Sequence, residues 1–474
     1  MALFFTCVLL LIAGYYVYGS FVDRIFAPDP GRAVPATTMA DGVDYVPMST
    51  AKIWLIQLLN IAGLGPIFGP ILGALYGPSA LLWIVIGCIF AGAVHDYFSG
   101  MLSVRNKGDS VPNVVGRELG EGFRQFMNYF SIVLLLLVGI VFVLGPGKLL
   151  GQLTGWPVNY WVAAIFAYYF LATILPIDKI IGRFYPLFGA LLLFMSISLT
   201  VMIMLSPEHK VLPQGLSLEN LHPKDLPIWP LMFITIACGA ISGFHATQSP
   251  LMARCVTSEK NGRFVFYGAM IGEGVIALIW ATLGLSFYQD SAALGAAIAK
   301  GSPSGVVNEV AQALLGGGIG SVLAVLGVVV LPITSGDTAF RAARLIIAEY
   351  IKMPQAAPAK RLMIAIPLFA IGFVISLGDF NVIWRYFGWA NQTLAMVMLW
   401  AAAAYLIKRG KLHWICTIPA TFMTAVTFAY ISAEKIGFNL PYTWANAIGI
   451  AAAVLALAWF FAAFGKKVGS VPAE

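Results

Sequence analysis

Thirteen apolar runs set the limits on how this chain can fold. A run of about 20 apolar residues is long enough to cross a bilayer as an α-helix. The chain is 60% hydrophobic and 10% charged, whereas a soluble surface needs about 25% charged side chains. We therefore predict an all-α polytopic membrane protein. The expected spans are Leu3–Phe21, Ile53–Leu75, Ala80–Phe98, Phe126–Val143, Val158–Leu175, Tyr185–Leu205, Ile228–Phe244, Phe264–Phe287, Ile319–Ile333, Leu362–Leu377, Tyr386–Leu406, Trp414–Ile431 and Trp444–Phe464.

The basic residues indicate how the spans are oriented. Of the 28 Lys and Arg, 22 lie in connections that follow odd-numbered spans and six in connections that follow even-numbered ones. Lys and Arg concentrate on the cytoplasmic side of membrane proteins. We therefore expect the N-terminus outside and the C-terminus in the cytoplasm. The net charge of +7 comes without a basic helix or stacking motif, which argues against nucleic-acid binding.

Two of the spans contain residues that interrupt a helix at membrane depth. The second span has Gly and Pro residues throughout positions 60–70, and the seventh is rich in Gly and polar residues over positions 237–250. Non-helical backbone in a membrane is tolerated only where protein buries it or where it lines a cavity. The bland alternative is that Gly and Pro are simply frequent in transmembrane helices. We interpret the paired interruptions as a binding site.

Because the two broken spans are five apart, they run in opposite directions. This spacing predicts an inverted repeat, which resembles the LeuT-like architecture with one extra helix before the core and two after it. We expect an extra helix and loop in residues 1–49, one repeat unit in 50–206, its inverted copy in 227–408, and two further helices and a tail in 411–474. In each unit the second span is followed by a long connection with a helical pattern.

Ionisable residues at membrane depth are expensive and are therefore candidates for function. His95 and Asp96 end span three, Glu273 lies within span eight, and Asp337 ends span nine. A buried carboxylate or histidine can carry a proton whose affinity changes as a cavity alternates between two sides. His95 could instead anchor a loop. Asp337 could instead form a structural ion pair with Arg341, four residues later on the same helical face.

The two broken spans and span eleven supply the candidates for substrate binding. We predict contributions from three places: Gly65, Pro66 and Gly69; Ser242, Gly243, His245 and Gln248; and Arg385, Asn391 and Gln392 of span eleven. Arg385 could bind a carboxylate through a bidentate pair. It could equally be an interfacial anchor paired with Asp379.

A pair of hydroxyl residues raises the question of sodium. Thr334 and Ser335 lie where a LeuT-like protein brings hydroxyls toward the first broken helix, close to the carbonyls near Gly63. Such hydroxyls also bond to their own helix backbone, which leaves sodium as the alternative to a proton.

Four ordered blocks resemble the signature segments of the carbon-starvation protein A family: His95–Gly108, Ser242–Pro250, Ser335–Arg341 and Trp384–Gln392. The resemblance runs from the first span to about the twelfth. It implies a bacterial inner-membrane permease that imports pyruvate or peptides, driven by the proton gradient. Some relatives are longer at the C-terminus, which puts in doubt any role of that extra region here.

Competing functions have weaker support in the sequence. A channel would show a continuous polar stripe rather than two inverted helix breaks. No HExxH, GxSxG or P-loop motif is present, so an enzyme or an ATP-driven pump is not expected. The five cysteines show no metal-ligand spacing and are interpreted as small core residues. We therefore predict a secondary transporter without cofactor or metal.

Overall fold

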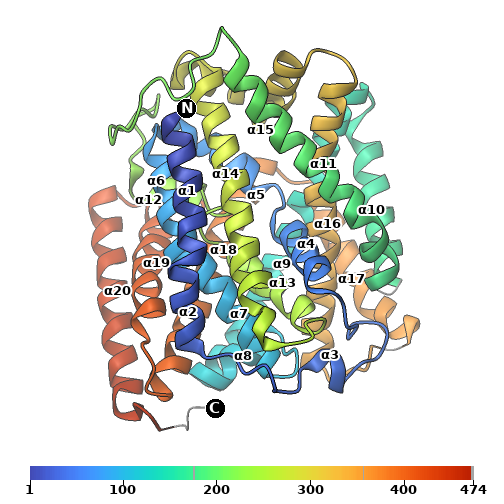
Figure 1. Ribbon diagram of the computed structural model, residues 1–474, viewed down its shortest axis with the longest axis vertical. Helices are drawn as coiled ribbons and strands as arrows, with labels where there is room; N and C mark the ends of the chain where they lie inside the picture. Colours follow the sequence, from blue (N-terminus) through green and yellow to red (C-terminus); the bar gives the residue numbers. More distant parts are fainter. Residues whose placement is uncertain (175–176, 356, 471–474) are drawn as a thin grey trace.

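The computed structural model describes residues 1–174, 177–355 and 357–470. All secondary structure in this part of the chain is helical, as the composition predicts. The predicted end of the fifth span at Leu175 and the side chains of Lys179 and Arg183 lie outside what is described. In Figure 1 the N-terminus lies at the end of the bundle near α15, and the C-terminus lies at the opposite end near α8.

The first part of the chain forms one extra helical region and the first set of core helices. Its elements are α1 Ala2–Tyr16, α2 Tyr18–Phe26, α3 Pro35–Thr38, α4 Thr50–Ile61, α5 Gly65–Gly73, η1 Ala74–Tyr76, α6 Ser79–Gly87, η2 Cys88–Gly92, α7 Ala93–Arg105, α8 Val111–Leu119, α9 Glu121–Thr154, α10 Val158–Ile174 and α11 Ile177–Leu205.

The second part contains the other core helices and two C-terminal ones. Its elements are α12 Ile228–Thr235, α13 Gly243–Ala253, η3 Glu259–Asn261, η4 Arg263–Tyr267, α14 Gly268–Phe287, α15 Ser291–Leu315, α16 Ile319–Tyr350, α17 Pro358–Ser376, α18 Phe380–Lys408, α19 Trp414–Ala433, α20 Tyr442–Phe464 and η5 Gly465–Lys467.

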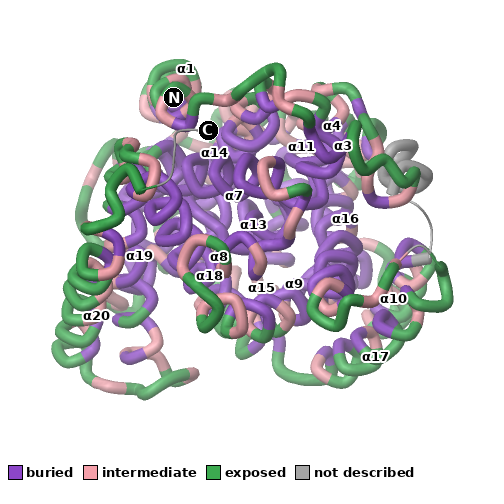
Figure 2. Tube along the Cα trace, turned by 90° about the horizontal axis from the view of Figure 1, so that it is seen from below, coloured by how far each residue is buried: buried purple, intermediate pink, exposed green. Residues whose placement is uncertain are grey.

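Ten described helices are long and apolar enough to cross a membrane, and the bent pair α4 and α5 makes an eleventh candidate. The two remaining predicted spans correspond to α10, which is shorter, and to the pair α12 and α13. The count of thirteen therefore stays a prediction. Figure 2 shows that buried residues concentrate around α7, α13, α14 and α18, whereas α10, α17 and α20 present exposed residues at the periphery.

Both predicted helix breaks are present in the structure, but each is shorter than the stretch that the sequence suggests. The first break covers Ala62–Leu64, between α4 and α5, which bend by 49°. Gly65 and Pro66 already belong to the first turn of α5, because proline is tolerated there, where its missing N–H is not needed. The second break covers Ile236–Ser242, so His245 and Gln248 lie in α13 rather than in the break.

The connections α8 and α15 fall where the repeat pattern predicts helices, and Figure 1 shows them at opposite ends of the bundle. A further match between the repeats is not visible in the sequence. A π-helical turn, η2, precedes α7, and another, η4, precedes α14. The two turns touch, because the Tyr267 hydroxyl donates to the carbonyl of Ile89 at 2.9 Å. Such turns are often found at functional sites.

Candidate functional site

The half-helix α5, which follows the first break, packs directly against the second break and the end of α12. A Cβ atom added to Gly65 would lie 2.2 Å from both the Cβ and the Sγ of Cys238, and one added to Gly69 would lie 2.8 Å from the carbonyl oxygen of Thr235. Glycine is therefore required at both positions so that α5 can approach the second break. The predicted residues Gly65, Pro66 and Gly69 are all buried in this contact region.

Backbone groups freed by the breaks are bound by buried polar side chains. The Asn391 Oδ1 atom accepts a hydrogen bond from the N–H of Phe244, at 2.6 Å, and the same amide bonds to the Ser242 hydroxyl. Asn391 therefore caps the first turn of α13 from another helix. A Cβ on Gly243 would lie 2.2 Å from the carbonyl oxygen of Asn391, which explains why glycine begins α13.

The helix on the other side of the second break is held in a similar way. The Gln392 amide donates to the carbonyl of Phe233, in the last turn of α12, at 3.3 Å. The Trp83 indole donates to the carbonyl of Ile236, inside the break, at 3.2 Å. An unpaired buried carbonyl would cost about 1–3 kcal/mol. Asn391 and Gln392 thus support the two sides of the break, and direct substrate contact by either residue stays a prediction.

The hydroxyls of Thr334 and Ser335 meet the first break as predicted, but at a different carbonyl. Each lies 3.1 Å from the carbonyl oxygen of Leu59, and each also bonds to the carbonyl of Leu331 in its own helix. The hydroxyls therefore satisfy their own helix backbone, as one interpretation of the sequence predicts, and they also bond to α4. Sodium coordination stays a prediction.

Four ionisable side chains from three helices form a continuous buried chain. His95 Nδ1 lies 2.8 Å from Asp96 Oδ1, and Asp96 Oδ2 lies 2.9 Å from His245 Nδ1. The opposite ring nitrogen of His245 lies 3.3 Å from Glu273 Oε2. All four are fully buried. His95 and Asp96 are neighbours on α7, and their side chains turn toward each other. Asp96 links α7 to α13, and His245 links α13 to α14.

Asp337 stands apart from this chain. It is buried in α16, and neither of its carboxylate oxygens has a hydrogen-bond partner among the described residues. The ion pair with Arg341 that the helical spacing suggests is not what the structure shows. Arg341 Nη2 donates to the carbonyl of Ala172, and Nη1 lies 3.7 Å from Asp44. Asp44 comes from the loop before α4, a partner that helical spacing could not reveal.

Arg385 lines a hollow at the α15 end of the bundle, of about 690 Å³, together with Phe68, His222, Lys224 and Trp384. Burial and the neighbouring Lys224 hold the pKa of His222 below its usual range, so Arg385 and Lys224 carry the positive charge there. Arg385 pairs with Glu434 at 3.2 Å. The pairing with Asp379 expected from the sequence is wrong, because Asp379 instead caps the first turn of α18 through the N–H groups of Asn381 and Val382.

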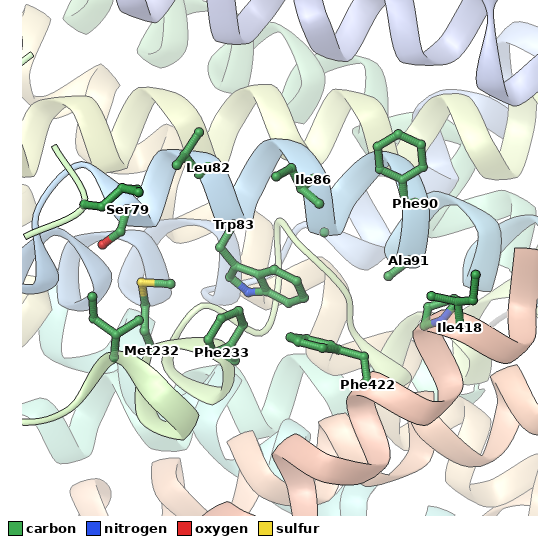
Figure 3. A pocket seen from close by; sticks show the side chains of 14 residues that line it. Ser79, Leu82, Trp83, Ile86, Phe90, Ala91, Met232, Phe233, Ile418 and Phe422 are labelled. Carbon is green, nitrogen blue, oxygen red and sulfur yellow. The ribbon is translucent and has the colours of Figure 1, made fainter. Parts of the chain in front are cut away.

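A second hollow lies on the other side of the second break. Figure 3 shows Trp83, Phe233 and Phe422 converging on it, and its volume is about 520 Å³. Apart from Ser79 its lining is apolar or aromatic, and Ile86 and Ile418 are exposed, as lipid-facing residues would be. This almost wholly apolar lining makes it a poor place for a charged nutrient.

Sequence reasoning overlooked several polar groups beside the breaks. Gln57 and Asn60 project from α4 at a spacing of three, and both are fully buried. The Gln57 amide lies 3.4 Å from the Ser249 hydroxyl, and the Tyr185 hydroxyl donates to Asn60 Oδ1 at 3.0 Å. One amide atom of each has no partner among the described residues, and the same holds for Gln248 Oε1. The sequence signal that could have identified them is the presence of two amide side chains within an apolar span.

This arrangement defines the class of protein. Paired, mutually inverted broken helices with ionisable groups between them are the construction of secondary active transporters. The chain belongs to the carbon starvation protein CstA family, whose model matches residues 1–145, 144–316 and 290–430.

Relatives and solved structures agree with this assignment. A Haemophilus influenzae relative described as an uncharacterized membrane protein is 52% identical and aligns with 64% of this chain and 95% of its own. The peptide transporter CstA of Escherichia coli is 24% identical over 91% of this chain and 81% of its own. The pyruvate/proton symporter BtsT of the same species is 26% identical over 56% and 46%. A manganese transporter from Eremococcus coleocola shares the fold, with TM-score 0.59, 13% identity and coverage of 91% and 99%.

Proposed function

We propose that this transporter imports a small carboxylate nutrient of the pyruvate class together with protons across a bacterial inner membrane. The observation that carries the proposal is the buried chain His95–Asp96–His245–Glu273, which joins α7, α13 and α14 directly behind the second break. Its four groups exchange protons readily near neutral pH when their surroundings change. It therefore provides a place for a proton whose binding depends on the conformation of α13.

The placement of the substrate follows from the breaks. The N-terminus of α13 carries a partial positive charge that favours a carboxylate. Gln57, Asn60 and Gln248 offer unpaired amide atoms nearby. On the charge distribution, the α15 end faces outside, so the hollow lined by Arg385 and Lys224 would receive an anion first. A short peptide is the other candidate, because the Escherichia coli relative CstA is described as a peptide transporter.

Uptake into proteoliposomes tests the proposal. We expect an imposed proton gradient to drive accumulation of labelled pyruvate above equilibrium, while a sodium gradient does not. Glu273→Gln should abolish accumulation driven by the proton gradient, because the amide cannot release a proton, while the exchange of substrate at equal pH continues. Accumulation by Glu273→Gln at the wild-type level would contradict the assignment of the proton. Accumulation of di- and tripeptides but not pyruvate would contradict the substrate.

Sodium coupling is a second candidate because of one observation. Thr334 Oγ1, Ser335 Oγ and the carbonyl oxygen of Leu59 gather at the first break, and oxygen ligands suit a hard cation. In this case a sodium gradient alone would drive uptake, and the double variant Thr334→Ala with Ser335→Ala would lose the sodium dependence. Thr338→Ala is the matched control, because its hydroxyl bonds only to its own helix among the described residues.

A further inference from the structure

Three side chains that bind transition metals meet at the second break. Cys238 lies in the break itself, His245 in α13 and Glu273 in α14. One ligand atom from each, the Cys238 Sγ, a His245 ring nitrogen and a Glu273 carboxylate oxygen, lie within 4.8 Å of one another, and all three residues are buried. Their positions in the sequence follow no metal-binding motif, so only the fold brings them together.

The geometry is close to that of a tetrahedral site. Zinc binds Cys, His and carboxylate ligands with bonds of about 2.0–2.3 Å, which places ligand atoms about 3.3–3.7 Å apart. His245 Nε2 and Glu273 Oε2 are already 3.3 Å apart. The thiol must approach by at most about 1.5 Å, which rotation of the cysteine about its Cα–Cβ bond and a rotation of the carboxylate can supply. Three protein ligands leave a fourth position for water.

The surroundings of His245 provide an independent argument. A metal-binding histidine almost always donates its other ring N–H to a carboxylate, a backbone carbonyl or water, which fixes the ring orientation. Asp96 Oδ2 lies 2.9 Å from His245 Nδ1, so that Nε2 points toward Glu273. His95 in turn holds Asp96 at 2.8 Å. His245 Nε2 and Glu273 Oε2 face each other at 3.3 Å without forming a hydrogen bond, and Glu273 Oε1 has no hydrogen-bond partner among the described residues, although all three atoms are buried. Buried polar atoms of this kind call for a ligand.

We propose that Cys238, His245 and Glu273 form a binding site for a thiophilic divalent cation of the Zn²⁺ class. Neither the predicted substrate nor proton coupling requires Cys238, so the site adds a ligand to those that transport uses. A bound ion occupies Glu273 and His245 and therefore excludes the proton. This second statement rests on the proposed function, whereas the binding itself does not.

Binding is measured on the purified full-length protein in detergent. We expect one Zn²⁺ per chain by metal analysis, and with Co²⁺ a near-ultraviolet absorption band from cobalt–thiolate charge transfer. Cys238→Ser removes this band and weakens binding by at least about 10- to 100-fold. A loss of this size is typical even for residues that only hydrogen-bond to a metal ligand. Glu273→Gln weakens binding but keeps the band. Cys416→Ser is the control, because Cys416 is equally buried but lies in α19.

Folding is checked by the melting temperature and size-exclusion profile, and Cys238→Ala serves if the serine variant is unstable. Absence of Zn²⁺ binding, or binding that both Cys238 variants retain, overturns the metal site. In proteoliposomes, Zn²⁺ should lower proton-driven uptake of the wild type but not of Cys238→Ser, each compared with its own metal-free rate. Binding without inhibition leaves the metal site standing and contradicts the assignment of the proton to Glu273 and His245. Lack of binding by a protein that accumulates substrate contradicts the metal site alone.

Discussion

Gly65 and Cys238, one from each broken helix, are in such close contact that a single methyl group on Gly65 would lie 2.2 Å from both the Cβ and the Sγ of Cys238. The half-helix that follows the first break thus packs directly on the second break. The contact couples the angle of α5 to the position of the second break.

The first prediction concerns this contact. Gly65→Ala should destabilise the protein by about 1–3 kcal/mol through overpacking and lower uptake. Adding Cys238→Gly removes the clashing atoms and should restore the melting temperature in part. Gly305→Ala is the control, because nothing lies within 4 Å of its added Cβ. Equal destabilisation by Gly65→Ala with and without Cys238→Gly would show that the contact does not determine the packing.

The second prediction concerns the cap of α13. Asn391→Ala leaves the N–H of Phe244 without its partner and the hydroxyl of Ser242 with only the Cys238 thiol, and should cost about 1–3 kcal/mol of stability. Asn391→Asp keeps an acceptor for the N–H of Phe244 and should cost less. Thermal unfolding in detergent measures both variants. A larger loss for the aspartate variant would contradict a capping role.

The third prediction concerns the α8 end of the bundle, which several contacts close. Arg254 Nη2 lies 2.8 Å from Glu349 Oε1, linking the residue that follows α13 to α16, and Glu349 also accepts hydrogen bonds from Ser110 and Asn113. Glu349→Gln should weaken this closure by about 1.5–3 kcal/mol, the range for hydrogen bonds to charged groups. The open state of this end should become more populated.

Cys255 reports on that opening. Burial raises the pKa of its thiol to about 11. At pH 7 about one molecule in 10⁴ then carries the reactive thiolate, against about one in 30 for an exposed cysteine. Because the thiol is also fully buried, labelling by a maleimide requires this end to open, so it should be slow in the wild type and become faster at pH 7 in Glu349→Gln. Cys255→Ser gives the background. An unchanged labelling rate in Glu349→Gln would rule out this pair as a closure.

The fourth prediction concerns Arg385 in the hollow at the α15 end. Arg385→Gln should raise the KM for an anionic nutrient up to about tenfold and leave the maximal rate unchanged. The reason is that a surface charge steers a ligand toward the site but does not fix it there. The effect should shrink at high salt. Glu434→Gln keeps the arginine and removes its partner, so KM should stay equal or fall. A fall in the maximal rate of Arg385→Gln at unchanged KM would contradict a steering role.

The architecture could be predicted because its signals are local. Apolar length identifies spans, and glycine and proline identify interruptions within them. The exact extent of the breaks could not be predicted, since Pro66 is compatible with the first turn of α5 as well as with a break. No residue pattern distinguishes the π-helical turns η2 and η4 from an α-helix, so they could be found only in the structure.

The candidate site was predicted as separate residues rather than as a group. His95, Asp96, His245 and Glu273 each stand out as ionisable residues in apolar spans, but their connection depends on the packing of α7, α13 and α14. Cys238 gave no signal, because a lone cysteine in a membrane helix is most often a core residue. The partner of Arg341 was predicted wrongly, because spacing within a helix favours Asp337 while a distant loop supplies Asp44. The roles of all these residues in transport stay predictions.

Asn391 and Gln392 are neighbours on α18, yet one supports the start of α13 and the other the end of α12. Both halves of the interrupted helix are therefore hydrogen-bonded to the same helix, α18. If α12 tilts relative to α13, one of these two hydrogen bonds to α18 breaks. If α12 and α13 move together with α18, both bonds are kept. Any cycle that keeps these bonds must carry α12, α13 and α18 as one piece past the remaining helices.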